Sequence, residues 1–371
     1  MIVGIDAREL QGRPTGTGRY LRSLIRQWTL EDSGDRFVAY FNGGIPADPV
    51  LREPKILIRS SKDEPIQALR WQEGYLPAAV QRDLVDVFFS PAYTCPLRLR
   101  IPRVTAVHDL SFFSVADDFS LREAFRRRVL TGLSIRASSR VLACSAFTRR
   151  EIGSFFPESA GRVREIPLGP DEDLPQAPGR TEARARLGVE GPLLLTVGTL
   201  LNRRNLATLI QAAGLLARRF PKLVLDVVGD NRTHPRIDFE ARALRLGLEG
   251  RVRLSGFVTD TGLADRYAAA DVAVFLSSYE GFGLPALEAA ARRVPLVLSR
   301  CPSLGEVFAG AARFVEPQDP ADVADAVAEV LDDAQARAGL IDAGLALASR
   351  HSWARTARLT RQALREAAGV P

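Results

Sequence analysis

Residues 271–288 hold the most informative chemistry in the chain. They read DVAVFLSSYEGFGLPALE, an apolar run that ends in two serines and continues through a glycine-bracketed turn, with Pro285 where a helix takes its first residues. The N–H groups of Phe282, Gly283 and Leu284 would then be unpaired donors at the positive end of a helix dipole. Such a helix start is suited to bind hydroxyls or an anion.

Two glutamates flank this turn. Glu280 precedes it and Glu288 follows eight positions later, so we expect both carboxylates to face the same pocket. Each carboxylate accepts two hydrogen bonds at once, which suits vicinal sugar hydroxyls. The alternative is a charge pair beside an ordinary helix; the Gly-Phe-Gly-Leu-Pro run between the two glutamates favours the binding site.

A second candidate is the loop at 198–206, which opens with Gly198 and Thr199. Arg203 and Arg204 lie in it between an apolar strand and a helix, so two guanidiniums and a helix start converge where a diphosphate would fit. Such cations could also stabilise negative charge that grows on a phosphate group during a reaction. An arginine pair at a solvated helix start is the alternative interpretation.

The first half offers weaker signals. Gly16 and Gly18 open a helix after the first strand, but Leu21 stands where the dinucleotide fingerprint needs a third glycine. His108, followed by Asp109, ends an apolar run. A lone histidine is usually structural, whereas a histidine and aspartate pair at a strand end is a better candidate for a site.

Short apolar runs alternate with longer amphipathic stretches along the whole chain, which predicts an α/β fold with mostly parallel strands. The segment 167–180, PLGPDEDLPQAPGR, lacks an apolar period and predicts a linker. We expect domains at 1–168 and 181–352, a linker at 169–180, and a C-terminal helix at about 353–371 that packs back on the first domain. Predicted strands are 2–5, 37–41, 55–59, 85–89, 104–107, 141–144, 163–166, 193–197, 223–228, 252–254, 272–275 and 295–298.

Composition narrows the class of protein. The 371 residues are 46% hydrophobic and 25% charged, which excludes disorder, and no run reaches the length of a membrane span. The N-terminus lacks the pattern of a signal peptide, so we expect a cytoplasmic protein. Three cysteines without metal-ligand spacing argue against a disulfide framework or a zinc cluster.

The net charge of +6 lies entirely in the first 170 residues, which carry 25 Arg and Lys against 19 Asp and Glu. Part of this excess sits on the helix predicted at 121–137, where Arg122, Arg126, Arg127 and Arg128 accompany apolar residues. Two interpretations stay open: an ordinary solvated surface, or a face for an anionic membrane or acceptor. The second would make the protein peripheral on the inner face of a membrane.

The segment EGFGLPALEA resembles the two-glutamate signature of the family-4 retaining glycosyltransferases, which have the GT-B architecture of two Rossmann-like domains facing across a cleft. Further matches occur in the right order over nearly the whole chain. They are TGTGRYLRSLI, VTAVHDLSFF, VLACSAFTRREI, VGTLLNRRNLATLI and HSWARTARLT.

The resemblance implies a role for each candidate residue. It places the donor diphosphate on Arg203 and Arg204, with Gly198 and Thr199 beside them, the ribose on Glu288, and the sugar on Glu280 and the backbone of 282–284. It implies that the nucleobase lies near Phe257 and Val258. It brings Gly16 and Gly18 toward the donor phosphates, and makes His108, Asp109 and Ser145 the acceptor side. Catalytic roles fall to His108, Glu280, Arg203 and Arg204.

The resulting hypothesis is a retaining glycosyltransferase of polysaccharide biosynthesis that needs neither metal nor other cofactor. It would move a hexosyl or deoxyhexosyl unit, with mannosyl favoured, from a nucleotide diphosphate sugar to a glycan or lipid-linked acceptor. A nucleotide-sugar epimerase or phosphorylase of the same architecture is the main alternative, and an NAD-dependent oxidoreductase is disfavoured by the incomplete glycine fingerprint. A nucleic-acid partner is not expected, because the basic residues are dispersed. The nucleobase, the sugar, the acceptor and the oligomeric state stay open.

Overall fold

The computed structural model describes residues 1–12, 15–31, 33–61, 64–115, 118–172, 174–177 and 179–370. Their contacts divide the chain into two units, each described by itself below. Unit 1 comprises Met1–Leu110, Arg122–Gly169 and His351–Pro371; unit 2 comprises Ser111–Leu121 and Pro170–Arg350. The segment Ser111–Leu121 therefore groups with unit 2, whereas the sequence placed it within the first domain. In the predicted linker, Asp173 and Pro178 lie outside the described residues.

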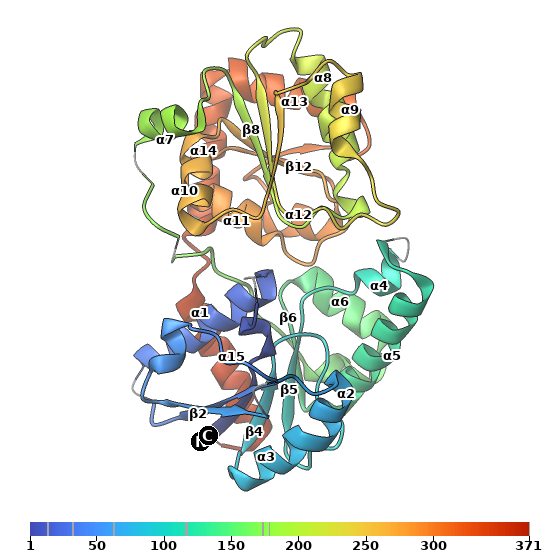
Figure 1. The fold of residues 1–371 in the computed structure, drawn as a ribbon, viewed down its shortest axis with the longest axis vertical. Coiled ribbons are helices and arrows are strands. Elements are labelled where there is room, and N and C mark those ends of the chain that lie inside the picture. Colours follow the sequence, from blue (N-terminus) through green and yellow to red (C-terminus); the bar gives the residue numbers. More distant parts are fainter. Residues whose placement is uncertain are drawn as a thin grey trace. The chain divides into compact units, whose positions relative to one another are not determined.

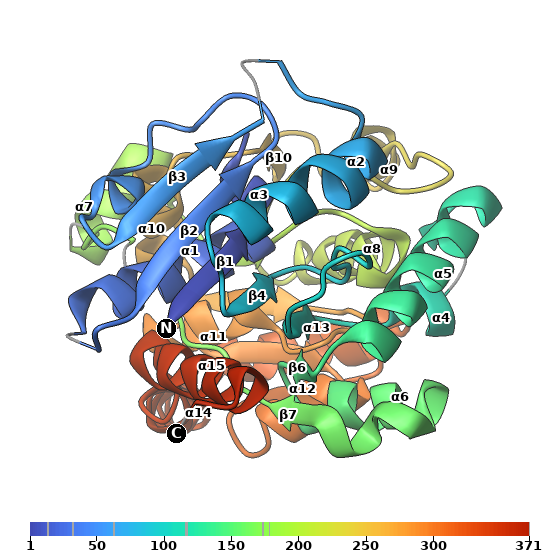
Figure 2. The ribbon, with the colours of Figure 1, turned by 90° about the horizontal axis from the view of Figure 1, so that it is seen from below.

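Unit 1 is built on one parallel sheet. Its strands, among the described residues, are β1 (Ile2–Asp6), β2 (Arg36–Phe41), β3 (Ile56–Ser60), β4 (Val87–Ser90), β5 (Arg103–Val107), β6 (Arg140–Ala143) and β7 (Val163–Glu165). They pair in the order β3-β2-β1-β4-β5-β6-β7, and Figure 2 shows the first three of these fanned side by side. The direction of strand addition reverses between β1 and β4, so ligands are expected at the carboxyl ends of these strands.

The helices of unit 1 are α1 (Gly16–Leu30), α2 (Ala68–Arg70), α3 (Leu76–Arg82), α5 (Leu121–Ala137), α6 (Ala146–Phe155) and α15 (Trp353–Ala368). Helix α15 packs along α1 and against β4, β5 and β6. The indole N–H of Trp28 donates to the carbonyl of Ala357 at 2.9 Å, which ties the two ends of the chain together inside unit 1. Large aromatic side chains, Trp28, Phe37 and Phe89 among them, fill this core.

Unit 2 has the same plan. Its strands are β8 (Leu193–Val197), β9 (Val224–Val228), β10 (Val252–Gly256), β11 (Val272–Phe275), β12 (Leu296–Ser299) and β13 (Arg313–Val315), paired in parallel in the order β10-β9-β8-β11-β12-β13. The direction reverses between β8 and β11. Its helices are α4 (Ser111–Ser114), α7 (Arg180–Leu187), α8 (Leu206–Leu216), α9 (Phe239–Arg245), α10 (Asp260–Ala269), α11 (Leu284–Ala291), α12 (Pro302–Val307), α13 (Pro320–Asp332) and α14 (Ala334–Ala348).

Alternating side chains of β8 and β9 supply two cores in unit 2. Leu194 on β8 joins the core under α8, α9 and α13, whereas the preceding Leu193 joins the smaller one under α7 and α10. Figure 1 shows α8 and α9 on one side of these strands and α7 and α10 on the other. Two sheets covered on both faces by helices confirm the predicted α/β class with two Rossmann-like domains.

Candidate active site

The candidate donor residues of unit 2 lie on the loops that leave the carboxyl ends of β8, β10 and β11. Strands β8 and β11 are neighbours at the point where the strand order reverses. Gly198 to Asn205 follow β8, and Leu276 to Gly283 follow β11. The topology therefore brings the arginine pair and the glycine-bracketed turn to one edge of the sheet, although 70 residues, 206–275, separate the two loops in sequence.

Asn205 fastens these two loops to each other. Its amide nitrogen donates to the carbonyl of Leu276 and to the hydroxyl of Ser278, both at 2.7 Å. The N–H of Ser278 in turn donates to the carbonyl of Arg203 at 2.7 Å. Asn205 adopts a left-handed backbone with φ of +49°, which asparagine tolerates better than most residues. The loop that carries the arginines is thus held in place by backbone and amide hydrogen bonds.

Arg204 crosses from the first loop to the second. Its Nη2 lies 3.2 Å from Oε1 of Glu280, and its Nη1 donates to the carbonyl of Val197 at 3.3 Å. The same carboxylate oxygen of Glu280 accepts from the hydroxyl of Ser277 at 2.7 Å. The buried Nε of Arg204 has no hydrogen-bond partner among the described residues. The guanidinium covers Gly198, whose φ of +125° and lack of a side chain make room for it.

Arg203 takes a different partner. Its backbone N–H and its Nη1 both donate to the carboxylate of Asp118, at 3.1 and 2.8 Å. Both side chains are nearly buried, with exposed fractions of 8% and 1%. Asp118 belongs to the segment Ser111–Leu121 that groups with unit 2. Nothing in the sequence singled out Asp118, because an aspartate in a polar loop carries no pattern of its own.

The turn before α11 has the backbone that the glycines predicted. Gly283 caps the helix with φ of +93°, and a side chain there would collide with Leu304 and Phe308. Pro285 stands in the first turn, and the first amides of the helix have no partner within it. Phe282 is buried and Leu284 half-buried, so the side chains pack inward while the backbone forms the helix start.

The two glutamates have separate environments. Glu280 is partly exposed and contacts Arg204, whereas Glu288 is 3% exposed and accepts a hydrogen bond from the Tyr267 hydroxyl at 3.0 Å. Tyr267 lies on α10, and nothing in the sequence singled it out. Thr199 and Phe257 are exposed at the ends of β8 and β10, and Val258 is half-buried.

His108 follows β5 in unit 1. Its Nε2 lies 2.8 Å from the carbonyl of Pro91, and because a carbonyl only accepts, this nitrogen carries the proton and leaves Nδ1 as an acceptor. The ring packs edge-on against Tyr20 at 4.9 Å between centroids. Burial lowers the pKa of His108, opposed by the Pro91 carbonyl and the charge of Asp109. The imidazole is therefore neutral at pH 7.

Three other predicted residues of unit 1 have roles in local structure. Ser145 is buried and caps α6 by accepting from the N–H of Thr148 at 3.1 Å. Gly18 packs its backbone against the carbonyl of Glu9, where no side chain would fit. Gly16 differs from both, because it is exposed and no atom approaches the position of a side chain there. Asp109 accepts a hydrogen bond from the hydroxyl of Tyr93 at 3.2 Å.

Comparison with known proteins identifies the family. The model for glycosyl transferases group 1 matches residues 180–346, and the model for Glycosyltransferase Family 4 matches residues 14–174. The O-antigen chain mannosyltransferase B of Escherichia coli is 30% identical over 361 residues, which cover 91% of this chain and 93% of that protein. The chain belongs to the group 1 glycosyltransferases. The predicted enzyme class is confirmed.

Other relatives of this glycosyltransferase differ in their named activities. The D-inositol 3-phosphate glycosyltransferase 2 of Catenulispora acidiphila is 31% identical, covering 94% of this chain and 89% of that one. Among solved structures, sucrose-phosphate synthase from Thermosynechococcus elongatus has a TM-score of 0.79 at 21% identity, with 98% of both chains covered. HepE from Anabaena in complex with UDP-glucose has a TM-score of 0.77 at 20% identity, covering 100% of this chain and 99% of that one. These likenesses confirm the GT-B fold.

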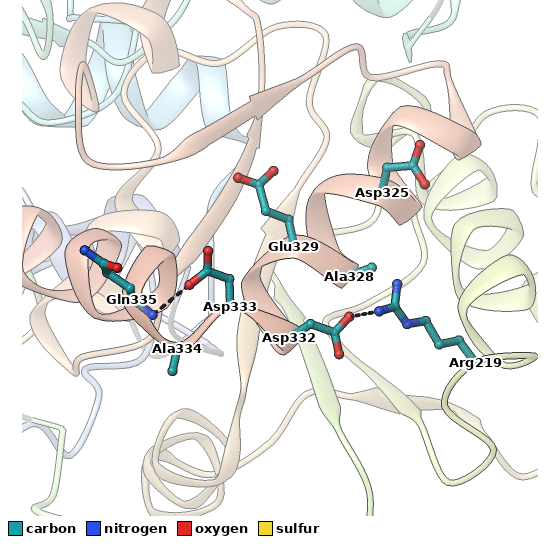
Figure 3. A pocket seen from close by; sticks show the side chains of 8 residues that line it. All are labelled: Arg219, Asp325, Ala328, Glu329, Asp332, Asp333, Ala334 and Gln335. Carbon is teal, nitrogen blue, oxygen red and sulfur yellow. Dashed lines mark hydrogen bonds and ion pairs between the residues drawn. The ribbon is translucent and has the colours of Figure 1, made fainter.

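A surface depression of about 600 Å³ also occurs in unit 2 of this glycosyltransferase, shown in Figure 3. Arg219 and Asp332 pair across it at 2.6 Å, and Asp325, Glu329 and Asp333 line it. Arg219 precedes β9 and Asp332 ends α13, so the depression lies at the opposite edge of the sheet from the arginine pair. Within the described ranges, no group of three or more His, Cys, Asp or Glu is arranged to hold a metal ion. Nor does any described helix combine the length and apolar character needed to span a bilayer.

Proposed function

We propose that this glycosyltransferase moves a hexosyl or deoxyhexosyl unit, with mannosyl favoured, from a nucleotide diphosphate sugar to a hydroxyl of a glycan or lipid-linked acceptor, with retention at the anomeric carbon. The observation that carries the proposal is the gathering of Arg203, Arg204 and the start of α11 at the strand reversal of unit 2. Two guanidiniums and a helix start suit a diphosphate. The names of two relatives support mannosyl transfer, and the HepE complex supports a nucleotide sugar donor.

In this proposal Arg204 neutralises the departing diphosphate, and Arg203 joins it by exchanging its contact with Asp118 for phosphate oxygens, so that a divalent metal is not required. Arg204 releases Glu280 in favour of the phosphate oxygens, and its orphaned Nε gains an acceptor. Glu280 then accepts from sugar hydroxyls and Glu288 from the ribose. The bond from the anomeric carbon to the phosphate oxygen breaks, the bond to the acceptor oxygen forms on the same face, and the acceptor proton passes to the leaving phosphate. On unit 1, neutral His108 offers Nδ1 to a hydroxyl.

The test assays the enzyme with four donors: GDP-mannose, UDP-glucose, ADP-glucose and dTDP-rhamnose. Nucleotide release and the anomeric configuration of the product are measured for each donor, with and without EDTA. We expect one donor to dominate, EDTA to leave turnover unchanged, and the product to keep the donor's anomeric configuration. Glu288→Gln should lower kcat/KM by about 10²-fold or more. Arg219→Ala, an arginine removed from the opposite edge of the same unit, is the matched control. An inverted product or a metal requirement would refute the corresponding part of the proposal; normal kcat/KM for Glu288→Gln would refute the site.

A further inference from the structure

Arg292 closes α11 in unit 2, and its guanidinium is held at three points. Its Nη2 donates to the carbonyl of Asp171 at 3.0 Å, and its Nη1 lies 3.5 Å from the carbonyl of Glu288, one helical turn earlier. Its Cζ lies over the ring of Tyr267, 5.4 Å from the ring centroid. A cation is favoured both at a helix C-terminus and over an aromatic face. The guanidinium is therefore fixed against the Tyr267 ring.

The hydroxyl of Tyr267 has two acceptors within reach. It lies 3.0 Å from Oε2 of Glu288 and 3.4 Å from the carbonyl of Pro285. A phenol carries one proton, so the nearer acceptor, which is the carboxylate, receives the stronger hydrogen bond. A small displacement of the ring would make the two acceptors equivalent. The guanidinium of Arg292, which lies over this ring, therefore helps to keep the proton on Glu288.

The hydrogen bond from Tyr267 orients the carboxylate of Glu288. That carboxylate is 3% exposed, and a buried charge needs donors placed around it. The two oxygens of a carboxylate accept about four hydrogen bonds in all, so donation to Oε2 leaves capacity for two sugar hydroxyls. A carboxylate that lost this donor would keep its charge but not its direction. Recognition of a ribose by Glu288 therefore depends on where the Tyr267 ring lies.

We propose that Arg292 is a positioning residue for donor binding, which acts through Tyr267 to aim the carboxylate of Glu288 at the ribose hydroxyls of the nucleotide. This role rests on the proposed function, which assigns the ribose to Glu288. The alternative is a structural clamp, in which Arg292 only fastens the segment around Asp171 to the end of α11. A clamp would change stability, whereas a positioning residue changes how well the enzyme recognises the ribose.

The experiment measures the Kd of the full chain for a nucleoside diphosphate and for its 2′,3′-dideoxy form, which lacks the ribose hydroxyls. GDP, UDP, ADP and dTDP are screened first, and the tightest binder is used. The test variants are Arg292→Met and Arg292→Gln, the second of which keeps an amide donor for the Asp171 carbonyl. Arg292→Lys restores the cation. Thermal unfolding monitors each protein.

The matched control is Arg219→Met. The guanidinium of Arg219 also lies over an aromatic ring, with its Cζ 5.6 Å from the ring centroid of Phe220, and it belongs to the same unit. It lies at the opposite edge of the sheet, paired with Asp332. The control therefore removes the same kind of contact at a place that does not meet Glu288.

We expect the wild type to prefer the ribose form by about tenfold or more, because hydroxyls bonded to a charged group contribute that much. Arg292→Met and Arg292→Gln should lower this preference by about threefold or more, through a higher Kd for the ribose form alone. Arg292→Lys and Arg219→Met should keep the preference. In a Tyr267→Phe background Arg292→Met should add no further loss, because the hydroxyl through which it acts is gone.

A folded Arg292→Met protein with the wild-type preference would overturn the positioning role. So would an equal rise in Kd for both forms, or an undiminished loss in the Tyr267→Phe background, since either result would make Arg292 a structural clamp. Glu288→Gln separates this role from the proposed function. Loss of the preference in Glu288→Gln but not in Arg292→Met would refute the positioning role alone, whereas an unchanged preference in Glu288→Gln would refute the ribose assignment and the positioning role together.

Discussion

The loop after β1 and the loop after β8 occupy equivalent places in the two units, since each follows the strand beside which the strand order reverses. After β1, Arg8 pairs with Asp6 of its own strand, by Nε to Oδ1 at 2.9 Å and Nη2 to Oδ2 at 2.6 Å, and lies over the ring of Trp71. After β8, Arg204 reaches Glu280 on another loop, and its Nε is left without a partner among the described residues.

This difference shows that an arginine at the same topological position can stabilise the fold in one unit and be available to a ligand in the other. In unit 1 the arginine is satisfied locally and bidentately, so its charge stabilises the fold. In unit 2 the arginine holds a distant carboxylate through a single longer contact, so an incoming anion can compete for it. Position at a strand reversal marks where a ligand can bind, but the partners of the charged side chains decide whether it does.

The largest predicted effect is the difference in activity and stability between variants of Arg204 and Arg8. Arg204→Ala should lower kcat/KM by about 10³-fold, because it removes the cation that faces the developing phosphate charge, with little change in thermal stability. Arg8→Ala should change kcat/KM little but lower the free energy of unfolding by about 3 kcal/mol. The reason is that the buried carboxylate of Asp6 would lose its ion-pair partner. Steady-state kinetics and denaturant unfolding of both variants measure this. Equal losses of activity in the two variants would contradict the claim that the two arginines have different roles.

A smaller effect should follow from freeing the arginine loop. Asn205→Gly keeps the left-handed backbone but removes the amide that ties the two loops, so misplaced guanidiniums should lower kcat/KM by about 10²-fold. The matched control is Asn202→Ala, which cuts the amide bonds from the same loop to the backbone of His234 instead. We expect the Asn202 variant to lose less activity. The ranking would be contradicted if Asn205→Gly retained wild-type kcat/KM.

Tyr267→Phe should have a smaller effect, which we expect in the KM for the donor. It removes the hydroxyl that donates to Glu288 while keeping the ring that packs in the core of unit 2. The loss of one hydrogen bond to a carboxylate corresponds to roughly a tenfold rise in donor KM, with kcat nearly unchanged. Initial rates over a range of donor concentrations separate the two constants. A fall in kcat alone would show that Glu288 acts on the transition state rather than on the bound ribose.

The smallest effect concerns the pH dependence of unit 1. Burial lowers the pKa of His108, so the unfolded chain takes up a proton near pH 6.5 that the folded chain refuses. Stability should therefore fall as the pH drops below about 6.5, by at most about 1.4 kcal/mol per pH unit from this group. His108→Gln should flatten that slope. Urea unfolding of both proteins at pH 7.5, 6.5 and 5.5 compares them, and parallel slopes would rule out His108 as the cause.

Most strands were predictable because a buried parallel strand is a short apolar run. The predicted 37–41, 193–197 and 272–275 agree with β2, β8 and β11 to within one residue. Strand β13 was missed, since Arg313–Val315 is three residues long and begins with a charge.

The placement of the candidate site residues in the fold was predictable where the signal lay in backbone chemistry. The glycines around Phe282 and the arginines between strand and helix are local patterns, and the fold places them as expected at the ends of β11 and β8. Asp118 and Tyr267 were missed, because their roles depend on contacts between segments distant in sequence: Asp118 meets Arg203 85 residues away. Ser145 was assigned to the acceptor side by resemblance; in the structure its hydroxyl caps a helix, and a contact with acceptor stays a prediction.

The central claim, that the arginines after β8 bind a diphosphate, is tested most directly by calorimetric titration of the wild type and Arg204→Ala with the preferred nucleoside diphosphate and with the matching nucleoside. The account predicts that the wild type binds the diphosphate far more tightly than the nucleoside, and that Arg204→Ala loses most of this difference while its affinity for the nucleoside is unchanged. Equal affinity of both proteins for the diphosphate would contradict it.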